Sequence, residues 1–139
     1  MRLFPNIKVW APWNLELGDR CALGDHIDCY SVGKITIGRN ATISQDAVLC
    51  TASHDHRDVE LPLTIGDIHI GDYAWITAQV FVMPNVHIGE GTVVGVRSTV
   101  LEDLPPWSVA VGTPCKTLGP RELHEKRGIE FAIKEGMNG

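Results

Sequence analysis

The side chains best suited to acid–base chemistry gather in one short segment, Ser53-His54-Asp55-His56-Arg57-Asp58. Histidine titrates near neutral pH and can take a proton from a hydroxyl, an effect worth roughly 10²- to 10⁴-fold in rate. We therefore predict His54 as a general base. Asp55 and Asp58 fit two roles, orienting an imidazole or binding substrate hydroxyls, and we predict Asp55 as a substrate contact. His56 fits either a substrate contact or an incidental position, because a charged loop is often no more than solvated.

The four cysteines, at positions 21, 29, 50 and 115, do not favour metal chemistry. They form no C-x-x-C pair of the kind that many zinc sites use. A free cysteine behaves as a small hydrophobe that is readily buried, so we expect these residues to fill the core. We expect no metal in this protein.

Length and composition indicate one ordinary globular domain. The chain has 139 residues, of which 44% are hydrophobic and 21% charged, and its net charge is −5. It has no cluster of Lys or Arg, so it lacks the basic face that nucleic-acid binding needs. No apolar run reaches the length of a membrane span and the first residues lack the apolar core of a signal peptide, so we expect a cytoplasmic protein.

The elements that must position His54 are indicated by an apolar residue at every sixth position. Helical spacing of three or four and strand alternation of two both fit these segments less well. A six-residue unit suits a short flat strand and a tight turn, with the apolar side chain pointing inward. The twelve positions are Leu17, Leu23, Cys29, Ile37, Ile43, Leu49, Ile70, Ile76, Val82, Ile88, Val94 and Val100.

Two further columns accompany the apolar one. Glycine often follows the apolar residue, and we expect there a turn that needs the backbone freedom of glycine. A small or β-branched residue stands four positions after the apolar one, where we expect a narrow corner. The glycines are at positions 18, 24, 38, 71, 89 and 95, and the small residues include Cys21, Ala41, Ala47, Ser53 and Ala74.

Three hexads close one triangular coil, and parallel strands of successive coils stack about 4.8 Å apart. The sequence therefore predicts an all-β fold, a left-handed parallel β-helix of hexapeptide repeats over residues 1–119. His69 and His87 are separated by three hexads, so we expect one above the other on an exposed face. Pro120 suits a helix start, and we expect a short C-terminal helix within residues 120–139.

The repeat fails at two places, an eight-residue unit over residues 29–36 and a longer interruption over residues 54–69. A loop that leaves a regular solenoid is usually functional. We therefore expect residues 54–69 to form the catalytic loop, with His54 at its base, where the rigid coil can hold it.

Several runs resemble the hexapeptide-repeat acetyltransferases, specifically the colanic acid biosynthesis acetyltransferase group; maltose and galactoside O-acetyltransferases are more distant relatives. The match spans residues 9–119, and the Ser-His-Asp loop together with the closing segment is its most specific part. The runs are Trp10-Ala11-Pro12-Trp13-Asn14-Leu15-Glu16-Leu17-Gly18-Asp19, Ile43-Ser44-Gln45, Leu49-Cys50-Thr51, Ser53-His54-Asp55, Pro105-Pro106-Trp107 and Gly112-Thr113-Pro114-Cys115-Lys116.

The resemblance implies an O-acetyltransferase that moves an acetyl group from acetyl-CoA to a hydroxyl of a sugar or glycan precursor. His54 then matches the base that deprotonates the acceptor hydroxyl. The stretch Trp75-Ile76-Thr77-Ala78 matches a segment that contacts coenzyme A near the thioester, so we expect Trp75 and the amide of Ala78 to bind the donor. Val96 matches a position that lines the pantetheine groove, and Lys116 matches a basic residue near the nucleotide end of coenzyme A.

The resemblance implies three further contacts and a partner. Arg121 is a second cationic candidate for the nucleotide of coenzyme A. Asp28 and Tyr30 lie in the coil before the catalytic loop, where relatives place part of the acceptor site. The family forms trimers with coenzyme A in the cleft between neighbouring prisms, so we expect a homotrimer with sites at subunit interfaces.

Two other functions use the same scaffold. A metal-dependent enzyme similar to the γ-class carbonic anhydrases needs three converging histidines, and His54 and His56 are too close together and lack an evident third ligand. A non-catalytic solenoid for assembly would have no use for the Ser-His-Asp loop and the closing segment. Acetyl transfer is therefore the function that the sequence favours.

Overall fold

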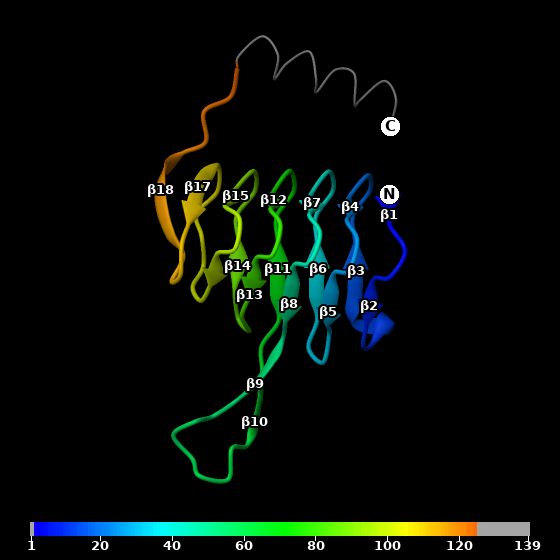
Figure 1. Cartoon of the computed structure of the whole chain (residues 1–139), viewed down its shortest axis with the longest axis vertical. Coiled ribbons are helices and arrows are strands. Elements are labelled where there is room, and N and C mark those ends of the chain that lie inside the picture. The colour runs from blue at the N-terminus through cyan, green and yellow to red at the C-terminus, as the bar shows by residue number, and fades with distance from the viewer. Residues whose placement is uncertain (1, 125–139) are drawn as a thin grey trace.

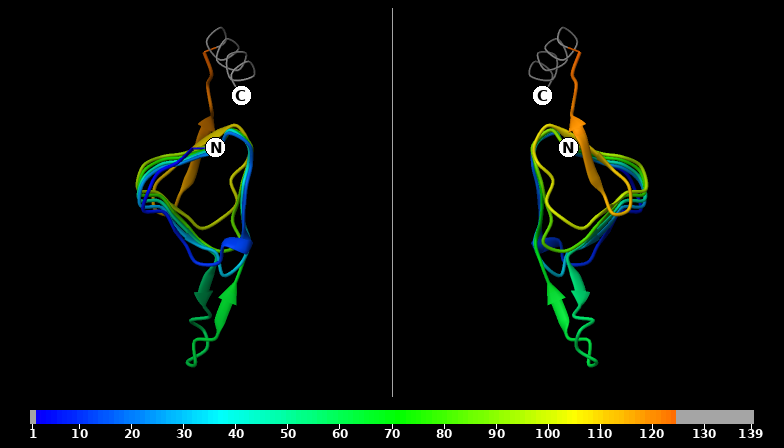
Figure 2. Two further views of the ribbon diagram at one scale, coloured as in Figure 1. Left: turned by 90° about the vertical axis from the view of Figure 1, so that its right-hand side faces the viewer. Right: turned by 90° about the vertical axis from the view of Figure 1, so that its left-hand side faces the viewer.

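The computed structural model describes residues 2–124 and shows a triangular prism built from stacked coils of the chain (Figures 1 and 2). Short parallel strands of successive coils pair edge to edge and form one sheet on each face. We call these sheet A, with seven strands, sheet B, with five, and sheet C, with four. The chain visits A, B and C in that order in each coil. The predicted left-handed parallel β-helix of hexapeptide repeats is confirmed.

The strands are short because each occupies only part of a six-residue unit. Sheet A contains β1 (Arg2–Leu3), β4 (Ala22–Leu23), β7 (Thr42–Ile43), β12 (Trp75–Ile76), β15 (Val93–Val94), β17 (Ser108–Val111) and β18 (Lys116–Pro120). Sheet B contains β2 (Lys8–Val9), β5 (Asp28–Tyr30), β8 (Val48–Cys50), β13 (Phe81–Val82) and β16 (Thr99–Val100). Sheet C contains β3 (Leu15–Leu17), β6 (Ile35–Ile37), β11 (Ile68–Ile70) and β14 (His87–Ile88).

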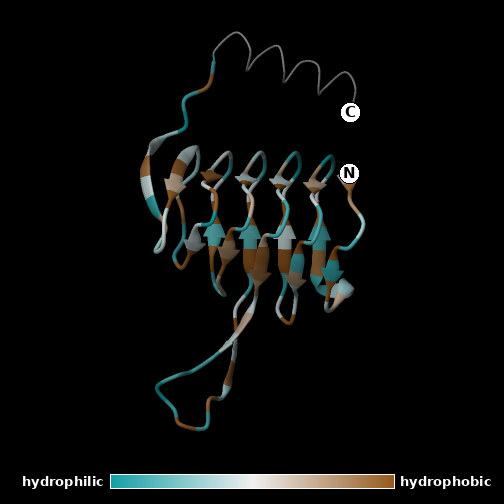
Figure 3. Cartoon of the chain, in the orientation of Figure 1, coloured by the Kyte–Doolittle hydropathy of each residue, from teal (hydrophilic) through white to brown (hydrophobic). Residues whose placement is uncertain are grey.

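The predicted inward positions build one continuous core, and Figure 3 shows hydrophobic residues in every coil. Eleven of the twelve apolar positions are 0–1% exposed, whereas Leu17, in the first coil, is half-buried. Of the predicted corner residues, Ser53 is the exception: it is half-buried and lies outside the coil. All four cysteines are free, and burial raises the pKa of the Cys29 thiol to about 12, as expected for a residue that fills the core.

The repeating glycines allow successive coils to pack closely. They do not adopt the left-handed backbone conformation that the sequence suggested, so that explanation of the glycine column is wrong. At Gly71 a Cβ atom would lie 2.6 Å from the amide nitrogen of Glu90 in the next coil. The left-handed residue of the turn stands two positions later, at Tyr73, with φ 61°. Because the coils stack about 4.8 Å apart, this corner brings backbone against backbone and leaves no room for a side chain.

The strand-pairing register shows how many residues separate paired positions in successive coils, with and without the two interruptions. Trp75 pairs with Val93, which lies three hexads further along the chain, as one regular coil requires. Ala22 pairs with Thr42, a slightly longer step, because the coil between them contains the eight-residue unit. The step from Thr42 to its partner Trp75 is much longer, because the second interruption leaves the prism altogether.

The longer interruption is an ordered β-hairpin that projects from the corner between sheets B and C (Figure 2). Its strands are β9 (Ala52–His54) and β10 (Leu63–Ile65), which pair antiparallel with His54 opposite Leu63. The predicted loop 54–69 is therefore shorter than expected, since Ile68 already begins β11. The alternation of Leu63, Thr64 and Ile65 is the local pattern of a strand.

Strand β18 runs antiparallel to β17 and closes the C-terminal end of the prism. Pro120, where the predicted C-terminal helix would begin, is the last residue of this strand. Residues 121–124 have no regular secondary structure, and the rest of the predicted helix lies outside the described residues. Within residues 2–124, no helix is long and apolar enough to cross a membrane.

Candidate active site

His54 is the last residue of β9 and its side chain is exposed. Its Nδ1 lies 2.8 Å from the carbonyl oxygen of Leu61, across the hairpin. A carbonyl oxygen can only accept a hydrogen bond, so Nδ1 carries the proton and donates it. In the neutral ring Nε2 then has a free lone pair, which is the state that a general base requires.

The hairpin backbone is shaped to present that carbonyl. Leu61 has φ 49°, a left-handed conformation that is unusual for a residue with a side chain. Its amide donates to the carbonyl of Asp58 at 2.9 Å, and the amide of Asp55 donates to the carbonyl of Pro62 at 2.9 Å. The sequence carries no signal for the Leu61 carbonyl, because every residue has a carbonyl and only the fold selects this one.

Asp55 does not contact the imidazole of His54. Its carboxylate accepts a hydrogen bond from Nε of Arg57 at 2.9 Å, and this contact lowers the pKa of the Asp55 carboxyl. Asp55 and Arg57 thus form an ion pair beside the candidate base, and His56 is an exposed residue of the same hairpin.

Three predicted residues come together in one groove. Trp75, Ala78 and Val96, with Ser44, Gln45 and Thr77, line an open groove of about 410 Å³. The groove follows the corner between sheets A and B, because its residues follow strands β7, β12 and β15, apart from Trp75, which lies in β12. The indole of Trp75 donates to Oγ of Ser44 at 2.9 Å, which fixes the ring at the rim.

The other lining residues of this groove, Ser44, Gln45 and Thr77, lie in matched runs of the sequence but were not predicted as site residues. Ser44 and Trp75 are far apart along the chain, and only the pairing register places them side by side. The backbone amide of Ala78 has no hydrogen-bond acceptor among residues 2–124, in a turn where the next residue, Gln79, does donate to the neighbouring coil. An N–H group of this kind can stabilise an oxyanion.

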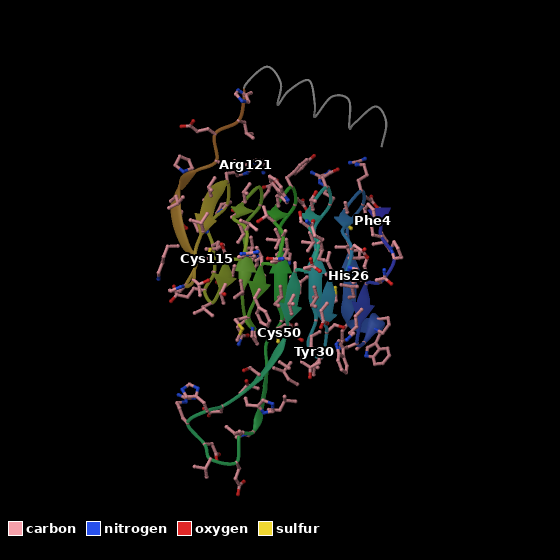
Figure 4. All side chains as sticks on the ribbon, viewed as in Figure 1. Phe4, His26, Tyr30, Cys50, Cys115 and Arg121 are labelled. Atoms are coloured by element: carbon pink, nitrogen blue, oxygen red, sulfur yellow. The ribbon has the colours of Figure 1, made fainter. Side chains whose placement is uncertain are left out.

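Lys116 and Arg121 lie at opposite ends of strand β18. Lys116 pairs with Val111, and the side chain of Val111 lies beside Gly95. Gly95 immediately precedes Val96 of the groove, so Lys116 lies on the groove side of sheet A. Figure 4 shows Arg121 far from Cys115, the neighbour of Lys116. The sequence grouped Lys116 and Arg121 around one nucleotide, and the structure separates them.

Arg121 is held by the protein itself. Its guanidinium donates to the carbonyls of Tyr73 at 3.2 Å and Gly91 at 3.0 Å. It also lies over the ring of Trp107, 5.9 Å from the centroid. These contacts are at the corner between sheets C and A, so within one chain Arg121 does not reach the groove.

Asp28 and Tyr30 lie together on the outer face of sheet B, joined by a third residue. The indole of Trp10 donates to Oδ1 of Asp28 at 3.2 Å. The rings of Trp10 and Tyr30 meet edge to face, with centroids 4.9 Å apart. Figure 4 places Tyr30 and Cys50 near the corner from which the hairpin leaves. Trp10 was not predicted, although its place in the matched run was a signal.

Within one chain the candidate base and the groove lie at different corners. The hairpin with His54 is inserted between β8 of sheet B and β11 of sheet C. The groove lies where the chain passes from sheet A to sheet B, at Thr77 and Ala78. Both corners bound sheet B, so this face lies between the hairpin and the groove.

The stacked histidines of sheet C, His69 and His87, lie apart from both the hairpin and the groove. His69 pairs with His87 in adjacent strands, with ring centroids 4.3 Å apart, as their three-hexad spacing predicted. Burial, and then the charge of His87, lower the pKa of His69. In the described part of the chain, no group of three or more His, Cys, Asp or Glu side chains is arranged to hold a metal ion.

No protein-family model matches the chain. Known proteins nevertheless resemble it in sequence and in fold. The chain is 44% identical over 117 residues to the putative colanic acid biosynthesis acetyltransferase WcaF of Escherichia coli K12, and the alignment covers 84% of this chain and 64% of that protein. It is 38% identical over 142 residues to the putative acetyltransferase SAR2635 of Staphylococcus aureus MRSA252, covering 96% of this chain and 70% of that protein. The chain thus spans about two thirds of the length of these relatives.

Solved structures give the same result. A maltose O-acetyltransferase of Clostridium difficile 630 superposes with a TM-score of 0.82 at 30% identity, over 88% of this chain and 67% of that one. The hexapeptide-repeat acetyltransferase VCA0836 of Vibrio cholerae, complexed with acetyl-CoA, superposes with a TM-score of 0.80 at 26% identity, over 88% and 68%. The chain therefore belongs to the hexapeptide-repeat acetyltransferases.

Proposed function

We propose that the protein transfers an acetyl group from acetyl-CoA to a hydroxyl of a sugar or glycan precursor, with His54 as the general base. The observation that carries this proposal is the hydrogen bond from Nδ1 of His54 to the Leu61 carbonyl, 2.8 Å long. It leaves the lone pair on Nε2, at an exposed position where an acceptor hydroxyl can approach. A relative complexed with acetyl-CoA supports the donor.

The proposed reaction is a direct transfer. Nε2 of His54 takes the proton of the acceptor hydroxyl while the oxygen attacks the thioester carbonyl. The resulting oxyanion needs a positioned donor, and the unpaired amide of Ala78 among the described residues is our candidate. When the C–S bond breaks, the imidazolium returns its proton to the sulfur of coenzyme A. The Leu61 carbonyl stabilises the imidazolium in between, because it accepts from Nδ1.

The donor is proposed to lie along the corner between sheets A and B. Trp75 and Val96 there supply exposed apolar surface for the pantetheine arm. Lys116, at the C-terminal end of the same corner, places a cation where the phosphates of coenzyme A would lie. The carbonyl contacts of Arg121 favour a role in holding β18 instead.

A complete site is proposed to need two copies of the chain. In a trimer with sheet B turned toward the threefold axis, the A–B corner of one prism meets the B–C corner of the next. Each groove then receives a hairpin with His54 from its neighbour. Sheet B suits this position because Phe81 on it and Leu101, directly after β16, are 37% and 51% exposed respectively.

The acceptor is proposed to bind near the hairpin corner. A sugar offers hydroxyls to carboxylates and apolar ring faces to aromatic side chains, and Asp28, Tyr30 and Trp10 form such a cluster. Asp55, beside His54, is a further candidate contact. The maltose O-acetyltransferase among the structural relatives supports a sugar hydroxyl as the target. We also propose a cytoplasmic location, in keeping with four free thiols.

The test is a thiol-release assay with acetyl-CoA and a panel of sugars and sugar nucleotides. We expect His54→Ala to lower kcat by about 10²-fold or more, the usual effect of losing a general base. His56→Ala, in the same hairpin and also exposed, is the matched control and should stay within about twofold of the wild type. Full activity of His54→Ala would show that the assignment of the base is wrong.

A further inference from the structure

The two interruptions of the repeat meet at one corner. The eight-residue unit bends out between β5 and β6, and we call its residues 31–34 the socket. The hairpin leaves the next coil at the same corner, between β8 and β11. At Gly33 in the socket, a Cβ atom would lie 2.8 Å from Cγ2 of Ile65 and 3.3 Å from Cβ of Thr51. The hairpin base therefore rests directly on the socket.

Thr51 joins the hairpin base to the socket from inside the protein. The residue is 0% exposed, and it immediately precedes β9. Its hydroxyl donates to the carbonyl of Tyr30 at 2.5 Å and accepts from the amide of Gly33 at 2.8 Å. Its own carbonyl accepts from the amide of Gly66 at 2.8 Å, where the chain returns from the hairpin. One buried residue thus links both strands of the hairpin base to the coil beneath.

The socket is itself fixed from the coil below. The side-chain amide of Asn14 donates to the carbonyls of Ser31 and Val32, both at 3.0 Å. The hydroxyl of Ser31, which is 0% exposed, donates to the carbonyl of Ala11 at 3.0 Å and accepts from the amide of that residue. Three successive coils are therefore stacked at this corner through buried or half-buried polar side chains.

Beyond its base, the hairpin packs little against the prism of its own chain. Val59, Leu61 and Leu63 are 98%, 51% and 53% exposed. The bond from His54 to Leu61 lies inside the hairpin, so it forms whichever way the hairpin points. The direction of the hairpin relative to the prism is consequently set at the base, by Thr51 and the socket.

We propose that Thr51 is the positioning residue of the catalytic hairpin: its buried hydroxyl fixes the direction in which the hairpin carries His54. This proposal rests on the proposed function only for its effect on activity. A base displaced by about 1 Å can cost about 10²-fold in rate, so the hydroxyl of a residue that touches no substrate is expected to matter for kcat.

The first variant is Thr51→Val, which keeps the shape and removes the hydroxyl. We expect amide hydrogen exchange to rise about 10-fold or more across residues 52–65. In the same variant kcat should fall about 10- to 100-fold, while KM for acetyl-CoA stays within about twofold. The ¹⁵N shifts of the His54 ring should still report the Nδ1–H tautomer. Thr51→Ser, which restores the hydroxyl, should recover both exchange and kcat.

The matched control is Thr92→Val. Thr92 is also 0% exposed, and its hydroxyl donates to the carbonyl of Pro105 at 2.5 Å. It stands at the corner between sheets C and A, away from the hairpin. Its loss should lower the unfolding temperature about as much as Thr51→Val does, but leave hairpin exchange and kcat unchanged.

Two results would overturn the proposal. One is unchanged hairpin exchange and kcat in Thr51→Val; the other is an equal loss of kcat in Thr92→Val. Should Thr51→Val fail to fold, Gly33→Ala tests the same contact between the socket and the hairpin base, since its Cβ would crowd Ile65 and Thr51 while the Thr51 hydroxyl remains. A wild type without acetyl transfer would instead refute the proposed function, and hydrogen exchange alone would then decide the role of Thr51.

Discussion

Nδ1 of His54 and the carbonyl oxygen of Leu61 are 2.8 Å apart, and they face each other across the hairpin. The partner that orients the imidazole is thus a backbone group on the far side of the hairpin. Asp55, the adjacent acid, is instead paired with Arg57. A backbone acceptor stays neutral, so it fixes the tautomer of His54 without adding a second titrating group to the site.

The first prediction concerns the backbone of Leu61. Leu61→Asn should keep kcat within about threefold, because asparagine tolerates the left-handed conformation and the carbonyl remains. Leu61→Pro should lower kcat about as much as His54→Ala, because proline locks φ near −65° and turns the carbonyl away. Steady-state kinetics together with the ¹⁵N shifts of His54 check this, and equal activity of the two variants would contradict it.

The second prediction concerns the groove. Val96→Trp should raise KM for acetyl-CoA about 10-fold or more, because Val96 lines the groove and is 63% exposed, so the larger side chain fills the groove without disturbing the core. Leu118→Trp, on β18 and 71% exposed, is the control of equal size and should leave KM unchanged. Equal KM values in both variants would argue against this groove as the donor site.

The third prediction concerns the glycine column. Gly71→Ala should lower the free energy of unfolding by about 1–3 kcal/mol, because the new Cβ would lie 2.6 Å from the backbone of Glu90. At Gly119 a Cβ atom meets nothing within 4 Å, so Gly119→Ala should change stability by less than about 0.5 kcal/mol. Urea unfolding of the two variants gives the comparison, and a neutral Gly71→Ala would refute the close-packing explanation.

The fourth prediction concerns pH. The pKa of His69 is lowered from its ordinary value of 6.5, mainly by burial and then by His87. The unfolded chain therefore binds this proton more readily than the folded one. The contribution of His69 to stability is complete above pH 6.5 and is lost as the pH falls through the lowered pKa.

The measurement for His69 is urea unfolding at about pH 8 and about pH 5, in the wild type and in His69→Gln. The variant has no imidazole at this position, so its loss of stability at the lower pH should be smaller than that of the wild type. An identical loss in both proteins would show that His69 does not contribute.

Side-chain patterns of this chain could be predicted from its sequence, whereas much of its backbone geometry could not. The coil could be predicted because each hexad must turn an apolar side chain inward, and Ile43, Ile76 and Val94 do so at 0% exposure. The glycine column was visible, but its cause was predicted wrongly. A left-handed backbone and close packing between coils both select glycine, so the sequence does not distinguish them. The second hairpin strand, Leu63–Ile65, alternates as a strand does, but its place inside the interruption of the repeat predicted a loop.

The candidate site was predictable only where it consists of side chains in recognisable runs, and their roles remain predictions. His54, Trp75, Ala78 and Val96 could be named in this way, but the carbonyl of Leu61 could not, because a backbone acceptor has no sequence signature. The role of Thr51 also escaped notice, since its partners Tyr30 and Gly33 depend on pairing across coils. The separation of Lys116 from Arg121 follows from the antiparallel course of β18, which no local pattern announces.

The measurement that tests the central claim most directly is complementation between two impaired variants, assayed at acetyl-CoA concentrations well below the KM of the wild type. His54→Ala keeps its groove and Val96→Trp keeps its base, so neither variant alone should turn over at the wild-type rate. If each site combines the groove of one chain with the hairpin of the next, equal co-expression should recover about a quarter of the wild-type rate, the fraction of interfaces with both parts intact. A co-expressed mixture no more active than the two variants measured separately would contradict the shared site.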